Sequence, residues 1–191
     1  MQITIGRKST SFFQNPLSLL NECHRRIERF LYLLITVTRY AQGGELNLEQ
    51  RNAWESSLRY FSSFAPKHTL DEEESLFPRM RATRNPEAKA VLEKIDALEK
   101  EHDVAQAYHK QMEALGRRWL NDGRLSDQDT YRLTELLSNL SSLYHKHIHL
   151  EETEVFPLAG RILNPREIEA IKREMAARRD IILEPQMITS G

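Results

Sequence analysis

The chain has a single cysteine, Cys23, among its 191 residues. One thiol can form neither an intramolecular disulfide nor a thiolate zinc or iron–sulfur site, and such scarcity is typical of a reducing compartment. Long apolar runs are also missing, since the longest extends only from Phe30 to Ile35 and is too short to cross a bilayer. The N-terminus lacks the apolar segment of a secretory signal. We therefore expect a cytoplasmic protein with no membrane partner.

An excess of charge of one sign is missing as well. Lys plus Arg (27) nearly cancels Asp plus Glu (28), so no overall field attracts nucleic acid, and we expect no nucleic-acid partner. Glycine and proline number only seven each, against 40% hydrophobic and 29% charged residues, a balance that is typical of a helical globular protein. The length predicts one domain, which we assign to residues 1–191.

Apolar residues recur at helical spacing in four long segments. The first is expected to begin at Asn15-Pro16, which offers a cap and a proline at the first helical position, and to run to Gly43-Gly44. The second carries an apolar stripe from Trp54 to Leu76 and is expected to stop near Phe77-Pro78 because proline breaks a helix.

The third segment is expected to begin at Asn85-Pro86 and to close near Gly123. Ser126-Asp127 predicts the start of the fourth, which we expect to be interrupted at Phe156-Pro157. Asn164-Pro165 predicts a shorter fifth helix.

The expected fold is therefore all-α. Four long amphipathic helices with short connections favour an antiparallel up-down-up-down four-helix bundle with a short C-terminal fifth helix. The bundle core would cover about 15–160, the extra helix 165–182, and a loose tail 183–191.

Two segments read alike, one from His68 to Pro78 and the other from His147 to Pro157. His, Glu, Glu, Phe and Pro align between them without a gap. In each copy the His and the first Glu are four residues apart, which places both on one helical face about 6 Å from each other. One helix can therefore present both to a metal centre. The second Glu of each copy, Glu73 or Glu152, is rotated by about 100° from the first around the helix axis. Its side chain could therefore face solvent, a neighbouring helix or a residue that binds the metal.

Each of the other two long stripes is interrupted by a histidine, His24 in the first and His102 in the third. Unpaired buried imidazoles and carboxylates cost several kcal/mol, on the order of a few for each neutral group and more for each charge. A pair of cations would compensate them, because imidazole nitrogen and carboxylate oxygen are ligands that iron and manganese accept. The predicted ligand set is His24, His68, Glu72, His102, His147 and Glu151.

The spacing supports this convergence unevenly. His24 and His68 lie at similar distances from the Gly43-Gly44 turn, and His102 and His147 lie at similar distances from the turn near Gly123. Between the second and third helices the match is poorer, so the third helix must begin beyond the bundle or be broken near its start.

The alternative interpretation of the repeat is a pair of surface helices held by salt bridges.

The remaining histidines give weaker indications of their roles. His109 lies two turns beyond His102 on the same face, where it would be a second-layer or access-channel group. His145 and His149 are rotated by about 200° from His147 and should face outward. Cys23 is expected to be an inert structural thiol.

A His in the first helix, His-x-x-x-Glu-Glu-x-x-x-Phe-Pro in the second and fourth, and Glu101-His102 in the third together resemble the hemerythrin-like family over roughly residues 15–160. The resemblance implies that the four histidines are terminal ligands and that Glu72 and Glu151 bridge two irons. Oxygen-carrying hemerythrins have a further His where this chain has Gln106. The site therefore resembles the six-ligand hemerythrin-like domain of the iron-sensing F-box ligase subunit more closely.

We therefore predict a non-heme di-iron binding protein that senses or binds dioxygen, peroxide, nitric oxide or iron. Its cofactor would be two iron ions in an oxo- or hydroxo-bridged pair, with manganese or zinc as substitutes, and its partner a small diatomic ligand or peroxide. One alternative is a di-iron oxidase or peroxidase. Another is a metal-ordered interaction module that docks a protein partner through residues 165–180. The basic residues of that segment would otherwise form a solvated face, and they are Lys172, Arg173, Arg178 and Arg179.

Overall fold

Every regular element of the computed structural model, which describes residues 15–182, is helical. The elements are α1 (Pro16–Ala41), α2 (Leu48–Ser63), α3 (Ala65–Leu70), a π-helical turn (Asp71–Leu76), α4 (Phe77–Ala82), a 3-10 turn (Pro86–Ala88), α5 (Lys89–Asp122), α6 (Asp127–Leu150), a second π-helical turn (Glu151–Val155), α7 (Phe156–Ile162) and α8 (Pro165–Ala177). The prediction of an all-α chain is confirmed for this range. The predicted tail 183–191 lies outside the described residues.

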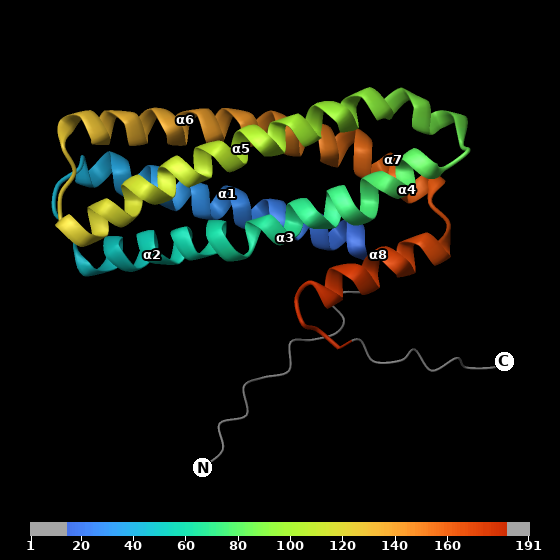
Figure 1. Ribbon diagram of the computed structural model, residues 1–191, viewed down its shortest axis with the longest axis horizontal. Helices are drawn as coiled ribbons and strands as arrows, with labels where there is room; N and C mark the ends of the chain where they lie inside the picture. Colours follow the sequence, from blue (N-terminus) through green and yellow to red (C-terminus); the bar gives the residue numbers. More distant parts are fainter. Residues whose placement is uncertain (1–14, 183–191) are drawn as a thin grey trace, which may run out of the picture.

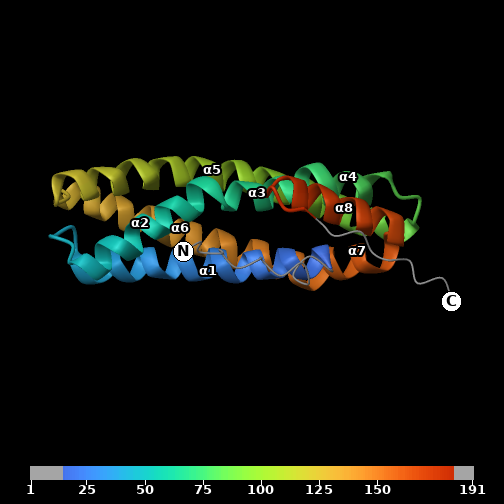
Figure 2. The same cartoon turned by 90° about the horizontal axis from the view of Figure 1, so that it is seen from below.

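Four helical arms lie side by side (Figures 1 and 2). The first arm is α1, the second is the succession from α2 to α4, the third is α5, and the fourth consists of α6 and α7 with the π-helical turn between them. The predicted short helix is present as α8, which packs against the π-helical turn of the second arm (Figure 2). None of the helices between residues 15 and 182 has the length and apolar character needed to cross a membrane.

The turns after α1 and α5 meet at one end of the bundle. The carbonyl of Gly43 accepts a hydrogen bond from the Leu125 amide at 2.8 Å, and that of Gly44 accepts one from the Trp119 indole at 2.8 Å. Gly43 has φ +75°, and a Cβ atom there would lie 2.1 Å from Thr130 Oγ1. Only glycine fits this contact, so Gly43 allows the two turns to lie against each other.

Three of the predicted helix starts are confirmed by their caps. The side chain of Asn15 accepts from the Leu17 amide at 3.0 Å, Ser126 from the Asp129 amide at 3.1 Å, and Asn164 from the Glu167 amide at 3.1 Å. These bonds satisfy amides that have no partner within the first helical turn.

The expected stop at Phe77-Pro78 is wrong, because the second arm continues to Ala82. The expected interruption near Phe156-Pro157 is present: α6 ends at Leu150, a π-helical turn follows, and α7 runs from Phe156 to Ile162. Immediately before each proline the helix widens to a π-helical turn, in which the Phe77 amide bonds to the carbonyl of Glu72 and the Phe156 amide to that of Glu151. The widened turn relaxes the regular ladder at the point where proline cannot donate, so the helix continues. Both turns begin at or one residue before a predicted ligand.

The long helix α5 resolves the uneven spacing between the second and third arms. It is unbroken over 34 residues, so the expected break near its start is absent, and it begins beyond the site but within the bundle, where it packs on α4 and α7. Its early residues Val91, Ile95 and Leu98 pack in an apolar cluster with Phe77 and Phe156, which belong to the continued second and fourth arms. The extra length of those arms is what gives the start of α5 a surface to pack on.

The buried apolar residues form two clusters with a polar layer between them. On α1, Leu20 belongs to one cluster and Ile27 to the other, and His24 lies between them. On α5, His102 lies in the same way between Leu98 and Ala105. Each arm therefore contributes to both apolar clusters and places its histidine at one common level along the bundle.

Candidate metal centre

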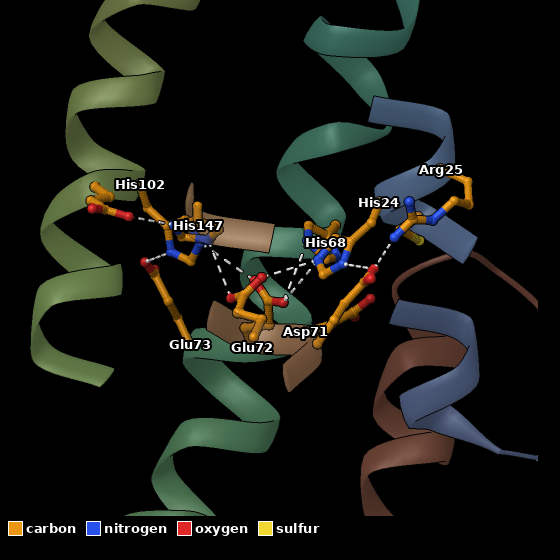
Figure 3. Close-up of polar contacts among 12 residues, drawn as sticks. His24, Arg25, His68, Asp71, Glu72, Glu73, His102 and His147 are labelled. Carbon is orange, nitrogen blue, oxygen red and sulfur yellow. Dashed lines mark hydrogen bonds and ion pairs between the residues drawn. The ribbon is translucent and has the colours of Figure 1, made fainter. Parts of the chain in front are cut away.

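The six side chains predicted as ligands come together at this level, from all four arms (Figure 3). Their donor atoms form two groups of four, each with its atoms within 4.8 Å of one another, and both groups contain Glu72 and Glu151. The first group adds His24 and His68, and the second adds His102 and His147. All six side chains are buried, with His102 the most accessible at 9%. The interpretation as surface salt-bridge helices is therefore wrong.

Glu72 turns one oxygen toward each histidine group. Its Oε1 lies 3.4 Å from Nε2 of His68 and 4.0 Å from Nε2 of His24, whereas its Oε2 lies 3.4 Å from Nε2 of His102. The carboxylate therefore spans the space between the two groups.

Glu151 does the same from the opposite arm. Its Oε2 is 3.0 Å from Nε2 of His24, and its Oε1 is 3.2 Å from Nε2 of His147. Two carboxylates thus divide their oxygens between two pairs of imidazoles, an arrangement in which each could bridge two cations.

Three of the histidines are held from behind by a glutamate. Nδ1 of His24 lies 2.9 Å from Glu152, that of His102 lies 2.8 Å from Glu73, and that of His147 lies 2.9 Å from Glu101. A carboxylate can only accept, so each Nδ1 carries the hydrogen and each Nε2 presents a lone pair to the centre. This is the tautomer that binds a metal through Nε2.

These outer contacts run from arm to arm. Glu73 of the second arm holds His102 of the third, Glu101 of the third holds His147 of the fourth, and Glu152 of the fourth holds His24 of the first. Arg25 also binds Glu152 from the first arm (Figure 3). The series stops at His68, whose buried Nδ1 has no hydrogen-bond partner among residues 15–182.

The centre leaves many polar atoms without a partner. Both oxygens of Glu72 and of Glu151 are buried and make no hydrogen bond of acceptable geometry within the described part of the chain. Nε2 of His102 and of His147 lie 3.0 Å apart, so two lone pairs face each other once both Nδ1 atoms carry hydrogen. Such groups cost several kcal/mol, on the order of 1–3 each, unless something compensates them. Cations between the carboxylates and imidazoles would do so, and the donor set therefore fits a metal centre.

Burial controls the protonation of this cluster. Burial and the neighbouring Glu151 carboxylate raise the pKa of Glu72 well above its usual range. Burial also raises the pKa of Glu151, but the imidazoles of His147 and His24 outweigh it and leave the net pKa low. The pKa of His68 falls well below its usual value because of burial and the nearby His24. A neutral His68 has a lone pair free for a metal.

The structure also shows what the glutamates beside the predicted ligands contact. Glu73 and Glu152 both contact a site histidine rather than solvent alone. Glu101 has the same role and was missed, although it shares with them the position directly beside a predicted ligand in the sequence. His145 and His149 are exposed, as predicted.

Cys23 is buried, and burial raises the pKa of its thiol, which is consistent with an inert side chain. His109 lies away from the cluster, where its Nε2 is 2.7 Å from the Tyr144 hydroxyl.

Of the four residues in the basic cluster of segment 165–180, Arg173 is exposed and the other three are engaged within the chain. Arg178 and Arg179 both bind the buried carboxylate of Asp71, the residue directly before Glu72. Lys172 is 8% exposed and pairs with Glu169. The interpretation as a solvated face is right for Arg173 and wrong for the other three, because the sequence does not reveal the buried acid that Arg178 and Arg179 face.

The chain is thus a helical bundle whose buried layer of histidines and glutamates is compatible with metal binding. The model of the hemerythrin HHE cation binding domain matches residues 15–159, and the chain belongs to this family. It is also 27% identical over 169 residues to an uncharacterized protein of Haemophilus influenzae, a match that covers 88% of this chain and 92% of that relative.

Proposed function

We propose that the protein binds a carboxylate-bridged pair of iron ions and uses it to sense or bind dioxygen, peroxide, nitric oxide or iron. The observation that carries the proposal is the way Glu72 and Glu151 divide their oxygens between two pairs of histidines. His24 and His68 would hold one ion and His102 and His147 the other. A bound iron pair supplies redox changes and coordination positions for small ligands.

Iron is proposed because the donors are imidazoles and carboxylates without thiolate, a set suited to iron and manganese and tolerated by zinc. The count of two rests on the two groups of donor atoms that share both glutamates. Membership of the hemerythrin family supports the same cofactor.

We further infer an antiparallel up-down-up-down bundle in one domain. The contact between the α1–α2 and α5–α6 turns at one end of the bundle supports this topology, because it requires the chain to reverse direction twice at that end.

A cytoplasmic location is part of the proposal and rests on the single cysteine.

A di-iron oxidase or peroxidase is the second candidate. A cavity of about 340 Å³ reaches all four site histidines, so a second reactant has room beside the centre. The alternative of a docking module has less support, since Arg178 and Arg179 are engaged within the chain itself.

Metal analysis of three variants tests the proposal. The wild-type protein, reconstituted with Fe(II) and analysed for metal, should hold two ions per chain and develop a visible absorption band on oxidation. Glu72→Ala and Glu151→Ala should each lose the paired site, because each removes one of the two shared carboxylates. His145→Ala is the matched control, as its side chain is exposed, and it should keep both ions. Equal metal content in all three variants would refute the assignment.

A further inference from the structure

A cavity of about 340 Å³ opens between α3 and α5 and extends inward beside the metal centre. Its mouth is formed by Leu70 of α3 and by Asp103 and Gln106 of α5, all of which are exposed. Gln106 lies one turn after His102 on α5.

The size of the cavity exceeds what a diatomic molecule or a peroxide needs. One water molecule takes roughly 30 Å³ of liquid volume, and a cavity of about 150 Å³ is enough for benzene. Pockets of about 300 Å³ and more are typical of sites for organic ligands. The volume here thus matches a small organic molecule that extends from the mouth toward the histidines.

The deeper walls are apolar and leave space because two of their residues are small. Ile27, Phe61 and Ile148 line the cavity together with Ala65 and Ala105. Lysine and arginine are missing from its described lining, whereas Asp103 and Glu73 belong to it. Away from the site histidines, an anion would meet only the acidic side chains of Asp103 and Glu73, so these walls favour an uncharged, mainly apolar ligand.

One polar pair lies within this apolar region. The Tyr144 hydroxyl is 2.7 Å from Nε2 of His109, and both residues line the cavity. Burial raises the pKa of Tyr144 and lowers that of His109 to about 4, so the phenol keeps its proton and the imidazole is neutral.

The Tyr144 hydroxyl then donates to Nε2, and the imidazole hydrogen lies on Nδ1. That Nδ1 is buried and has no hydrogen-bond partner in the described range. The ring is held in place by stacking on Phe61, with centroids 4.6 Å apart.

We propose that this cavity binds a small uncharged aromatic molecule with one hydrogen-bonding oxygen, which contacts the polar pair of Tyr144 and His109. The flat apolar part of the ligand lies against Phe61 and Ile148, and the oxygen faces this pair. The inference deepens the proposed function, on which it rests for the presence of iron beside the ligand. The cavity itself is formed by protein residues alone.

Titration with p-cresol tests the proposal. The iron-loaded protein and the metal-free protein should both bind it at one saturable site, detected by calorimetry and by shifts of the methyl NMR signals of isoleucine. Toluene, which lacks the oxygen, should bind at least tenfold more weakly. The anion p-toluate should not bind the metal-free protein, because the described walls carry no lysine or arginine. Absence of saturable p-cresol binding, equal affinity for toluene, or tight binding of p-toluate to the metal-free protein would each overturn the proposal.

Two variants locate the ligand. Ala105→Leu fills the cavity and should weaken p-cresol binding at least tenfold, and His109→Phe should remove the preference for p-cresol over toluene while toluene still binds. His145→Ala lies outside the cavity and should bind as the wild type does. Unchanged binding in both cavity variants would place the ligand elsewhere and refute the inference.

Metal analysis of the same samples separates the two proposals. Binding of p-cresol to a protein that takes up no iron supports the cavity site and refutes the proposed di-iron function. Iron uptake without p-cresol binding refutes only the cavity site.

Discussion

Each outer glutamate of the centre stands beside a site residue in the sequence but serves a histidine of another arm. Glu73 follows Glu72 and contacts His102, and Glu101 precedes His102 and contacts His147. The outer carboxylate fixes the tautomer of the imidazole and makes its other nitrogen a better ligand. The residues beside the predicted ligands therefore contact predicted ligands of another arm.

Replacing Glu73 by Ala should weaken metal binding by roughly 10- to 100-fold, which is the usual effect of removing such a partner. His102 then loses the acceptor for its Nδ1 hydrogen and is free to turn. Competition with a chelator of known affinity measures the change. Glu113→Ala is the control, since Glu113 pairs with Arg117 on the surface. Identical affinities of both variants would show that Glu73 has no part in the site.

His109 should make the stability of the metal-free protein depend on pH. Burial lowers its pKa to about 4, whereas in the unfolded chain the value is about 6.5. Between these values the unfolded state binds more protons, so the contribution is complete above about pH 6.5 and is lost as the pH falls toward 4. The loss is at most about 3 kcal/mol.

Urea unfolding at several pH values, with a chelator present, measures this dependence. His109→Gln keeps a polar partner for Tyr144 but cannot titrate, so its free energy of unfolding should fall less steeply between pH 6.5 and 4. Parallel curves for the two proteins would show that His109 titrates alike in the folded and unfolded states.

Among the elements, the π-helical turn Asp71–Leu76 connects the metal centre to α8. Arg178 reaches Asp71 at 3.0 Å and the hydroxyl of Ser75 at 2.9 Å, and Arg179 binds the same aspartate. On the other side, Glu174 of α8 takes two hydrogen bonds from Arg79. The helix after the bundle thus holds the segment that carries Glu72.

Replacing both Arg178 and Arg179 by Met should destabilise the fold by about 3 kcal/mol, because it leaves the Asp71 carboxylate buried without a cation. Urea unfolding gives the change in free energy, and hydrogen exchange in residues 165–177 reports on the docking of α8. Arg173→Met is the control on the same helix, where the side chain is 73% exposed, and it should change stability by less than about 0.5 kcal/mol. A double variant as stable as this control would show that the ion pairs contribute nothing.

On the scale of the whole molecule, the polar layer divides the core. The apolar cluster around Leu20 and Phe77 and the one around Leu34 and Trp119 are each continuous, and the six histidines and glutamates lie between them. Without cations this layer brings unpaired buried groups to the centre of the fold. Metal bound there should therefore stabilise the entire bundle, since it binds the folded chain alone.

Removing iron with a chelator should lower the melting temperature. With free metal at about 100 times the dissociation constant, binding adds roughly 2.7 kcal/mol, or about 5–10 °C for a chain of this size. Differential scanning calorimetry with and without the chelator measures the shift. Glu151→Ala should melt at the same temperature in both conditions. If the chelator left the melting temperature of the wild-type protein unchanged, the polar layer would be stable without metal.

The helices and the level of the site could be read from local pattern. His68 and Glu72, and likewise His147 and Glu151, share a helical face through their spacing, and the structure brings these four together with His24 and His102. Their role as metal ligands stays a prediction. The expected stop at Phe77-Pro78 failed because the local pattern contains no sign of the π-helical turn through which the second arm continues to α4.

Sequence alone determined the helical periods, the caps and the buried polar positions, because these depend on residues a few places apart. Tertiary structure decided which glutamate contacts which histidine and left Nδ1 of His68 without a partner in the described range. It also brought Arg178 and Arg179 to Asp71. Those contacts join residues whose separation is set by the rotation and axial shift of whole helices. Both quantities arise from the packing of all four arms at once, which no local stretch of sequence contains.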